Sequence, residues 1–204
     1  MNSVHHVPTQ DTTQLIQRMQ TFTILWMTVE ASVSLSAAWM ARSPALLAFG
    51  GDSAIELLSA AAVLWRFRSS AQERSEKQVA RIAATLLLML AAYVAVTSAM
   101  TLLGHREAKT TYLGITILIG AAAIMPWLAK EKRKLSATMG SAALRADAAE
   151  SALCAYLSVI ALVGLAINAI WQIWWADPIA ALVIVPLILW EGWEAMLGEA
   201  CGCC

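Results

Sequence analysis

The sequence predicts an all-α, polytopic membrane protein with six transmembrane helices, and three observations lead to that fold class. Of the 204 residues, 59% are hydrophobic and 14% are charged, whereas an average soluble domain is about 25% charged. The mean hydropathy of +0.64 agrees with this balance. Six apolar stretches are also long enough to cross a hydrocarbon core, which takes about 20 residues. The partner that these features predict is a lipid bilayer.

The expected spans follow one another along nearly the whole chain. They cover residues 22–41, 45–67, 79–103, 112–128, 141–170 and 174–197. The first span does not resemble a signal peptide, because it begins too deep in the chain and follows no basic segment. We therefore expect a polar N-terminal tail at 1–20, a transmembrane domain at 21–197 and a cysteine-containing tail at 198–204.

Basic residues divide unevenly between the two ends of these spans. Eleven of the fourteen lie on the N-terminal side or in the even-numbered connections: Arg18, Arg66, Arg68, Arg74, Lys77, Arg81, Lys130, Lys132, Arg133, Lys134 and Arg145. The odd-numbered connections hold Arg42, Arg106 and Lys109. Because basic residues beside spans stay on the cytoplasmic side, both termini are expected in the cytoplasm. The net charge of zero argues separately against a strongly basic nucleic-acid-binding protein.

Five acidic residues lie inside the expected spans, where charge is unfavourable. They are Glu30 in the first span, Asp52 and Glu56 in the second, and Asp147 and Glu150 in the fifth. Each ionised group near the bilayer centre costs about 2.5–3.5 kcal/mol. The spans offer no lysine or arginine to neutralise these acids, so we expect the acids to have a function.

Spacing places these residues on two helix faces at similar depth. Asp52 and Glu56 are four residues apart, as are Glu150 and Cys154, and Asp147 precedes Glu150 by three. At a rise of about 1.5 Å per residue, the first pair lies roughly 11–17 Å from the outer end of its span and the second pair roughly 14–20 Å from the cytoplasmic end. Both pairs lie near the midplane, where four ligands converge if the two helices touch.

Carboxylates and a thiolate around one point form a ligand set for a divalent cation. Zinc takes four ligands drawn from Cys, His, Asp and Glu, and a thiolate favours softer ions such as zinc or cadmium. These ligands lose protons when they bind metal, so binding is coupled to proton release. Whether Cys154 or Asp147 completes the site is open at this point. No organic cofactor is expected.

The same residues also have plainer interpretations. A buried acid such as Glu30 can hydrogen-bond a backbone group and stay protonated, and Asp52 with Glu56 can do the same in a packed bundle. Cys154 taken alone is more often a small buried hydrophobic residue than a ligand. Only its spacing from Glu150 favours a role in metal binding.

Three further acids lie in or near the last span. Asp177, in WWADPIA, precedes a proline and is expected to cap the N-terminus of that span rather than to bind metal. Glu191 and Glu194 lie close to its cytoplasmic end. We expect both glutamates to be interfacial.

Around these acids the sequence resembles the transmembrane domain of the cation diffusion facilitator family. The stretch SPALLAFGGDSAIELLSAAAVL is similar to the second helix of that family, with Asp52 and Glu56 on its two metal-ligand positions. The stretch LRADAAESALCAYLSVIALVGLAINAIWQIWWADPIAALVIVPLIL is similar to the fifth and sixth helices, with Glu150 on the usual His or Asp position and Cys154 on the usual Asp. The resemblance covers about residues 20–197.

The resemblance implies a homodimer that exports zinc or a related ion in exchange for protons, with Glu30 as a proton carrier or as an acid on the path of the entering metal. Three features depart from the family pattern. Glu56, Glu150 and Cys154 are not its commonest ligands, and the connection KEKRK has no His-rich run. The third departure is that only 198–204 follow the last span, where the family pattern has a cytoplasmic C-terminal domain. Short members similar to the vesicular zinc-transporting relatives also end soon after the sixth helix.

Three of the four cysteines lie in the final CGCC. Clustered thiolates bind soft cations, so Cys201, Cys203 and Cys204 are expected to gather metal at the cytoplasmic mouth. Lipidation of these juxtamembrane cysteines is a competing interpretation, and the absence of any role is a third.

The leading hypothesis is a divalent metal transporter, with zinc as substrate and protons as counter-ion, in the plasma or inner membrane, or in a vesicle membrane if the source is eukaryotic. The alternative is a membrane sensor or modulator that binds metal without moving it. An enzyme is not expected, because the one candidate nucleophile, Cys154, has no base beside it: His5, His6 and His105 lie outside the spans.

Overall fold

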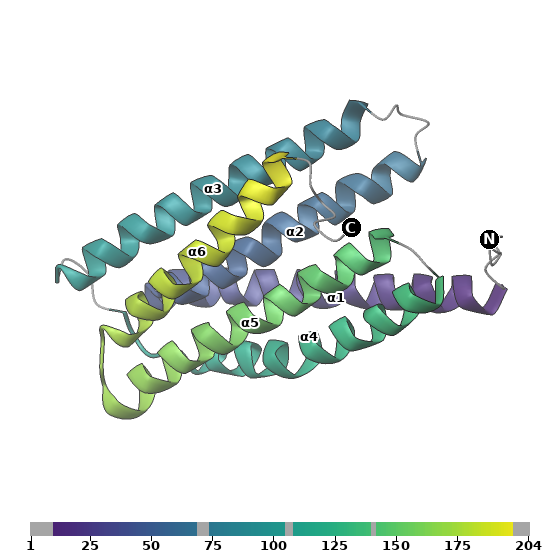
Figure 1. The fold of residues 1–204 in the computed structure, drawn as a ribbon. Helices are drawn as coiled ribbons and strands as arrows, with labels where there is room; N and C mark the ends of the chain where they lie inside the picture. The colour runs from purple at the N-terminus through teal and green to yellow at the C-terminus, as the bar shows by residue number, and fades with distance from the viewer. Residues whose placement is uncertain (1–9, 69–73, 105–107, 140–141, 198–204) are drawn as a thin grey trace.

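The computed structural model describes residues 10–68, 74–104, 108–139 and 142–197 (Figure 1). These residues form six helices and no strand, which confirms the predicted fold class. The helices are α1 (Gln10–Ala41), α2 (Pro44–Arg68), α3 (Arg74–Leu102), α4 (Tyr112–Met139), α5 (Ala142–Trp171) and α6 (Ala176–Leu197).

Two helices run well beyond their expected apolar spans. α1 begins at Gln10, inside the segment expected to be a polar tail. α4 continues to Met139, through residues 130–134, so placing those residues in a connection was wrong. Lys, Arg and Glu are good helix formers, and the helix persists where the hydropathy falls. The charged residues of this segment are therefore carried on α4 and lie against its neighbours.

Short turns reverse the chain after α1 and after α5. Arg42 and Gln172 directly follow these helices with φ angles of 54° and 55°, the left-handed conformation that commonly ends a helix. The amide of Ser43 reaches back to the carbonyl of Ala38 at 3.2 Å. These tight turns make the helices on either side antiparallel.

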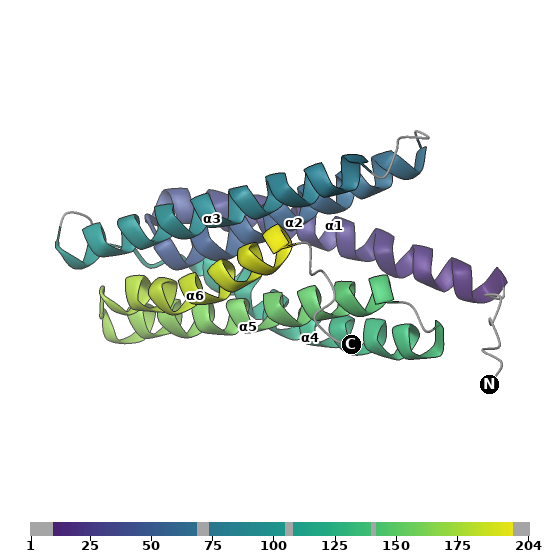
Figure 2. The ribbon, with the colours of Figure 1, turned by 45° about the horizontal axis from the view of Figure 1, so that its top comes forward.

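The helices form one elongated bundle in which α2 is central. α1 packs most extensively on α2, α4 on α5, and α3 on α6, and the two views show the helices running roughly along one direction (Figures 1 and 2). α2 also contacts α3, α5 and α6. Groups on α2 are therefore the natural meeting point for side chains from the rest of the bundle.

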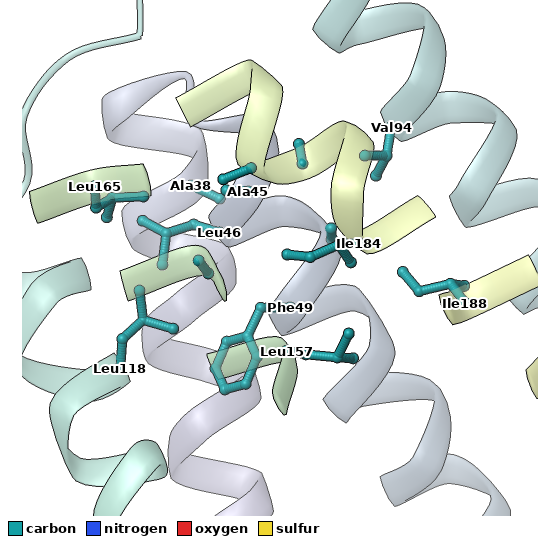
Figure 3. Packing of buried hydrophobic residues seen from close by; sticks show 14 of the residues in the cluster. Ala38, Ala45, Leu46, Phe49, Val94, Leu118, Leu157, Leu165, Ile184 and Ile188 are labelled. Atoms are coloured by element: carbon teal, nitrogen blue, oxygen red, sulfur yellow. The ribbon is translucent and has the colours of Figure 1, made fainter. Parts of the chain in front are cut away.

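The apolar core surrounds α2 (Figure 3). Leu46 and Phe49 of α2, Leu157 of α5, and Ile184 and Ile188 of α6 are fully buried. Many of the other core residues are alanines, and small residues allow helices to approach closely in membranes. Phe49 precedes Asp52 by one turn and Leu157 follows Cys154 by one turn, so this core adjoins the predicted metal site.

The outer surface of the bundle is apolar, as expected for a polytopic membrane protein. Large hydrophobic side chains are exposed on it, including Trp39 at 88% and Tyr112 at 81%. Among the described residues, five helices are long and apolar enough to cross a membrane, namely α1, α3, α4, α5 and α6. α2 is not among these five, and its contacts with four other helices place it inside the bundle.

Candidate metal centre

Two glycines bring α2 close to its neighbours immediately before the first acid of the site. A Cβ atom on Gly50 would lie 2.8 Å from the Cβ of Ser34 on α1, and one on Gly51 would lie 2.7 Å from a methyl group of Leu90 on α3. Neither position accommodates a side chain without movement of its neighbour. The GG pair therefore lets α2 fit between α1 and α3 and fixes Asp52 in the interior.

Asp52, Glu56 and Cys154 come together where α2 meets α5. Asp52 is fully buried and Cys154 is 1% exposed. The Cys154 thiol donates a hydrogen bond of 3.1 Å to Oε2 of Glu56. One ligand atom from each of the three residues lies within 4.8 Å of the other two. We call these three residues the α2–α5 cluster.

The carboxylates of this cluster lack hydrogen-bond donors. Both oxygens of Asp52 and Oε1 of Glu56 are buried and accept no hydrogen bond from the described residues. Buried polar groups are nearly always satisfied, and burying an unpaired charge is costly. A divalent cation held by these oxygens and by the thiolate would satisfy them all at once.

Glu150 lies near the α2–α5 cluster but is not part of it. Its charge acts on both Asp52 and Glu56, yet its carboxylate is not among the atoms that converge, and its side chain is exposed. Glu150 precedes Cys154 by four residues on α5, or about 6 Å along the helix axis. It therefore lies about one turn closer to the start of α5 than the thiol does.

Asp147 forms a separate cluster with groups from α1 and α4. Its Oδ1 lies 2.8 Å from Nζ of Lys132, and its Oδ2 accepts a 2.7 Å hydrogen bond from Gln20. Lys132, whose side chain is 1% exposed, also donates to Ser151 at 2.9 Å. We call Gln20, Lys132, Asp147 and Ser151 the lysine cluster.

The expectation that no lysine neutralises the acids of the spans was therefore wrong for Asp147. The apolar stretch ends before Lys132, but α4 does not, and Lys132 lies within the candidate span of α4. Asp147 is satisfied by protein groups, and the structure places it outside the α2–α5 cluster.

Glu30 is also satisfied by protein groups, although it lies next to the site. It is fully buried, and its two carboxylate oxygens accept hydrogen bonds from Trp26 Nε1 at 2.6 Å and from Ser53 Oγ at 2.7 Å. Ser53 directly follows Asp52. The link through Ser53 connects α1 to α2 beside the α2–α5 cluster.

Asp177 is a cap, but of a different helix from the one expected. Its Oδ1 accepts a 2.9 Å hydrogen bond from the Ser43 hydroxyl and a 3.3 Å bond from the Ala45 amide. Ser43 in turn accepts from the Leu46 amide at 3.1 Å. Asp177, at the start of α6, therefore satisfies the N-terminus of α2 and fastens the two helices together at that end.

Glu191 is an acidic neighbour of the site that sequence reasoning assigned to the membrane interface. Its charge acts on Asp52, and its Oε2 is buried without a partner among the described residues.

The sequence does contain a signal for this placement of Glu191. Buried residues on α6 recur every three or four positions: Asp177, Ala181, Ile184 and Ile188. Glu191 is the next position of the same stripe, and one stripe of a helix faces the core. The stripe, rather than distance from the helix end, predicts where this side chain points.

Cys201, Cys203 and Cys204 lie outside the described residues.

Comparison of the chain with known families gives one result: residues 21–197 match the sequence model of the cation efflux transmembrane domain. A search of curated proteins found no significant match. The matched region contains all five acids predicted within the spans, and Cys154.

Proposed function

The chain belongs to the cation efflux, or cation diffusion facilitator, family of divalent-cation transporters, and we propose that it exports zinc from the cytoplasm in exchange for protons. The proposed binding site is the α2–α5 cluster of Asp52, Glu56 and Cys154. The observation that carries this proposal is the convergence of three ligand atoms within 4.8 Å, where three of the four carboxylate oxygens have no partner among the described residues.

The donor set supports zinc over harder cations. Calcium takes six to eight oxygen ligands, and magnesium requires octahedral oxygen coordination. The α2–α5 cluster offers two carboxylates and a thiol in a tight, buried space, which is closer to a zinc site. Glu150 stands on the same helix as Cys154, and we propose that it supplies the fourth ligand when the helices shift during transport.

The same groups supply the proton coupling. A thiol and two carboxylates must be deprotonated to hold a metal ion, so the site gains protons when the ion leaves. Glu30 accepts a hydrogen bond from Ser53, which directly follows Asp52, and this supports a role for Glu30 on the proton path. We further propose a homodimer formed through membrane contacts, with the apolar outer surface of the bundle as the contact region.

The test is zinc-dependent proton flux in proteoliposomes that contain a pH-sensitive dye. We expect flux for the wild-type protein and none for Asp52→Ala. Glu131→Gln is the matched control, because Glu131 is a carboxylate on α4 that pairs with the exposed Lys134. Undiminished flux in Asp52→Ala would contradict the site, and zinc binding without flux in the wild type would favour a sensor.

A further inference from the structure

The two ends of the bundle enclose the α2–α5 cluster unequally. Toward the cytoplasmic end, Glu56 is half-buried and Glu150, one turn from Cys154, is exposed. Toward the opposite end, the next core residues, Phe49 and Leu157, are fully buried. The basic residues predict that this opposite end faces away from the cytoplasm, and we call it the outer end. The cluster is therefore less enclosed on its cytoplasmic side, and the contacts of the outer end close it on the other.

Close helix contacts seal the outer half of the bundle. A Cβ atom on Gly114 of α4 would lie 2.5 Å from a methyl group of Leu46 on α2, and one on Gly164 of α5 would overlap the Cβ of Ala180 on α6. Leu46 is fully buried within the apolar core (Figure 3). An ion that leaves the α2–α5 cluster toward the outer end must therefore separate helices that are in contact here.

Asp177 fastens α6 to α2 at the outer end. Its Oδ1 accepts the hydrogen bonds from Ser43 Oγ at 2.9 Å and from the Ala45 amide at 3.3 Å, and both Asp177 and Ser43 are buried. Its other oxygen, Oδ2, is buried without a partner among the described residues. The side chain thus holds α2 through a single oxygen, and two hydrogen bonds form a link that can break and re-form.

The connection between α3 and α4 fastens other helices at the same end. The Lys109 amide donates a 2.8 Å hydrogen bond to the carbonyl of Ala41, the last residue of α1. The Asn168 side chain of α5 donates to the Ala108 carbonyl at 3.3 Å. Neither bond involves α2 or α6. A movement of α6 away from α2, together with α3, on which α6 packs most extensively, would break the Asp177 link and leave these two bonds in place.

We propose, resting on the function proposed above, that the link of Asp177 to Ser43 and Ala45 is an outer gate. It is closed in this structure, and it opens when α6 and α3 move away from α2 to release the ion at the outer end. Alternating access needs one side to stay closed while the other is open, and a packed interface with two discrete arrangements provides such a device. Asp177 is a positioning residue, because it holds α6 against α2 without touching the ion.

The test measures how fast Cys154 is labelled from each side of the membrane by a charged, membrane-impermeant methanethiosulfonate reagent. Replacing Cys201, Cys203 and Cys204 by serine leaves Cys154 as the single thiol, since the chain has four cysteines. In this background, Asp177→Ala should raise the labelling rate from the outer side about tenfold, because two hydrogen bonds no longer favour the closed gate. The rate from the cytoplasmic side should not rise.

Two further variants separate the gate from general loosening of the fold. Asp177→Asn keeps an oxygen that can accept the same two hydrogen bonds, so its labelling rate from the outer side should stay close to that of the wild type. Ser43→Ala removes one of the two bonds and should give an intermediate rate, and it carries the test if Asp177→Ala does not fold. A purely structural role for Asp177 would instead raise the labelling rate equally from both sides.

A crosslink across the gate gives the complementary readout. Ser43→Cys combined with Asp177→Cys, in the same serine background, puts two thiols where the structure has a 2.9 Å hydrogen bond, a position suited to a disulfide. The oxidised protein should lose zinc flux and regain it on reduction, because the gate cannot open. It should keep the zinc-dependent rise in unfolding temperature, because Ser43 precedes Asp52 by nine residues, or about 13 Å along α2.

Several results would overturn the outer gate. They are an unchanged or two-sided rise in labelling for Asp177→Ala, undiminished zinc flux in the oxidised double-cysteine protein, and loss of its zinc-dependent rise in unfolding temperature, which would place the damage in the metal site. These outcomes are distinct from failure of the proposed function. If the wild-type protein shows no zinc-dependent flux, zinc–proton exchange is wrong, and the labelling rates decide whether the gate stands.

Discussion

The lysine cluster and the α2–α5 cluster lie two turns apart on α5, and they treat their carboxylates in opposite ways. Asp147 accepts hydrogen bonds from Lys132 and Gln20. Asp52 and Glu56 share a single hydrogen bond in the described structure, the one that Cys154 donates to Glu56. The first cluster is electrostatically complete without a ligand, and the second is not.

This difference separates structural acids from functional ones. A buried ion pair that is well hydrogen-bonded can hold helices together, and the lysine cluster joins α1, α4 and α5. A buried anion without a partner destabilises the fold and persists where it serves a function. Hydropathy and spacing alone do not distinguish the two cases, because both place an acid within a helix.

The largest expected effect on stability is in the lysine cluster. Lys132→Met would leave Asp147 without its cation, and breaking a buried pair costs about 3–5 kcal/mol. We expect the lower end of that range, because the Asp147 side chain is 25% exposed. The measurement is denaturant unfolding in detergent.

A matched control and a double variant sharpen this prediction. Lys134→Met, at a lysine that is 60% exposed, should cost little, because surface ion pairs contribute about 0–1 kcal/mol. Lys132→Met combined with Asp147→Leu should recover much of the loss. Equal destabilisation by Lys132→Met and Lys134→Met would show that the lysine cluster is not structural.

The α2–α5 cluster should instead respond to metal. Zinc at 100 times its dissociation constant stabilises a protein that binds it by about 2.7 kcal/mol. We expect this stabilisation in the wild type and its loss in Asp52→Asn, which removes a ligand charge but keeps the shape of the side chain. Thermal unfolding with zinc and with a chelator measures it.

Acidification should remove the zinc-dependent rise in the unfolding temperature, because protonated carboxylates and thiols do not hold the ion. Asp147→Asn should lower the stability of the zinc-free protein and leave the zinc-dependent rise in unfolding temperature unchanged. If that rise survives in Asp52→Asn, the α2–α5 cluster is not the zinc site.

Spacing in the sequence was sufficient to place Asp52 and Glu56 of α2 at the same depth as Cys154 of α5. Four ligands were expected to converge if the two helices touch, and the structure brings Asp52, Glu56 and Cys154 together but leaves Glu150 outside. Two placements were not predicted from the sequence, those of Lys132 and Glu191. Lys132 was treated as part of a loop because the hydropathy falls at Lys130, although the helix continues. Glu191 was judged by its distance from the helix end rather than by the buried stripe on which it lies.

Spacing leaves undetermined which neighbouring helix a residue meets at each depth of the bundle. Asp147, Glu150 and Cys154 lie within one sector of α5, yet they have three different environments. The neighbours change with depth: α4 supplies a lysine beside Asp147, and α2 supplies two acids beside Cys154. Which neighbour stands at each level depends on how the six helices pack, and a single sequence does not contain that information in readable form.

Cys154→Asp should change which metal is transported. A thiolate favours soft ions, and its replacement by a carboxylate favours harder ones. We expect the ratio of cadmium to manganese flux to fall about tenfold, which corresponds to about 1.4 kcal/mol of selectivity. The measurement is a panel of metals in proteoliposomes, with Cys201→Ser as the control for the loss of a cysteine. An unchanged ratio would mean that the thiol does not contact the ion during transport.

The smallest expected effect concerns the CGCC tail. If Cys201, Cys203 and Cys204 gather metal at the cytoplasmic mouth, replacing all three by serine should raise the half-maximal zinc concentration about threefold, because a tethered binding group raises the local supply of the ion. Maximal flux should not change, since the α2–α5 cluster is untouched. Unchanged flux at limiting zinc would leave the tail without a role in capture.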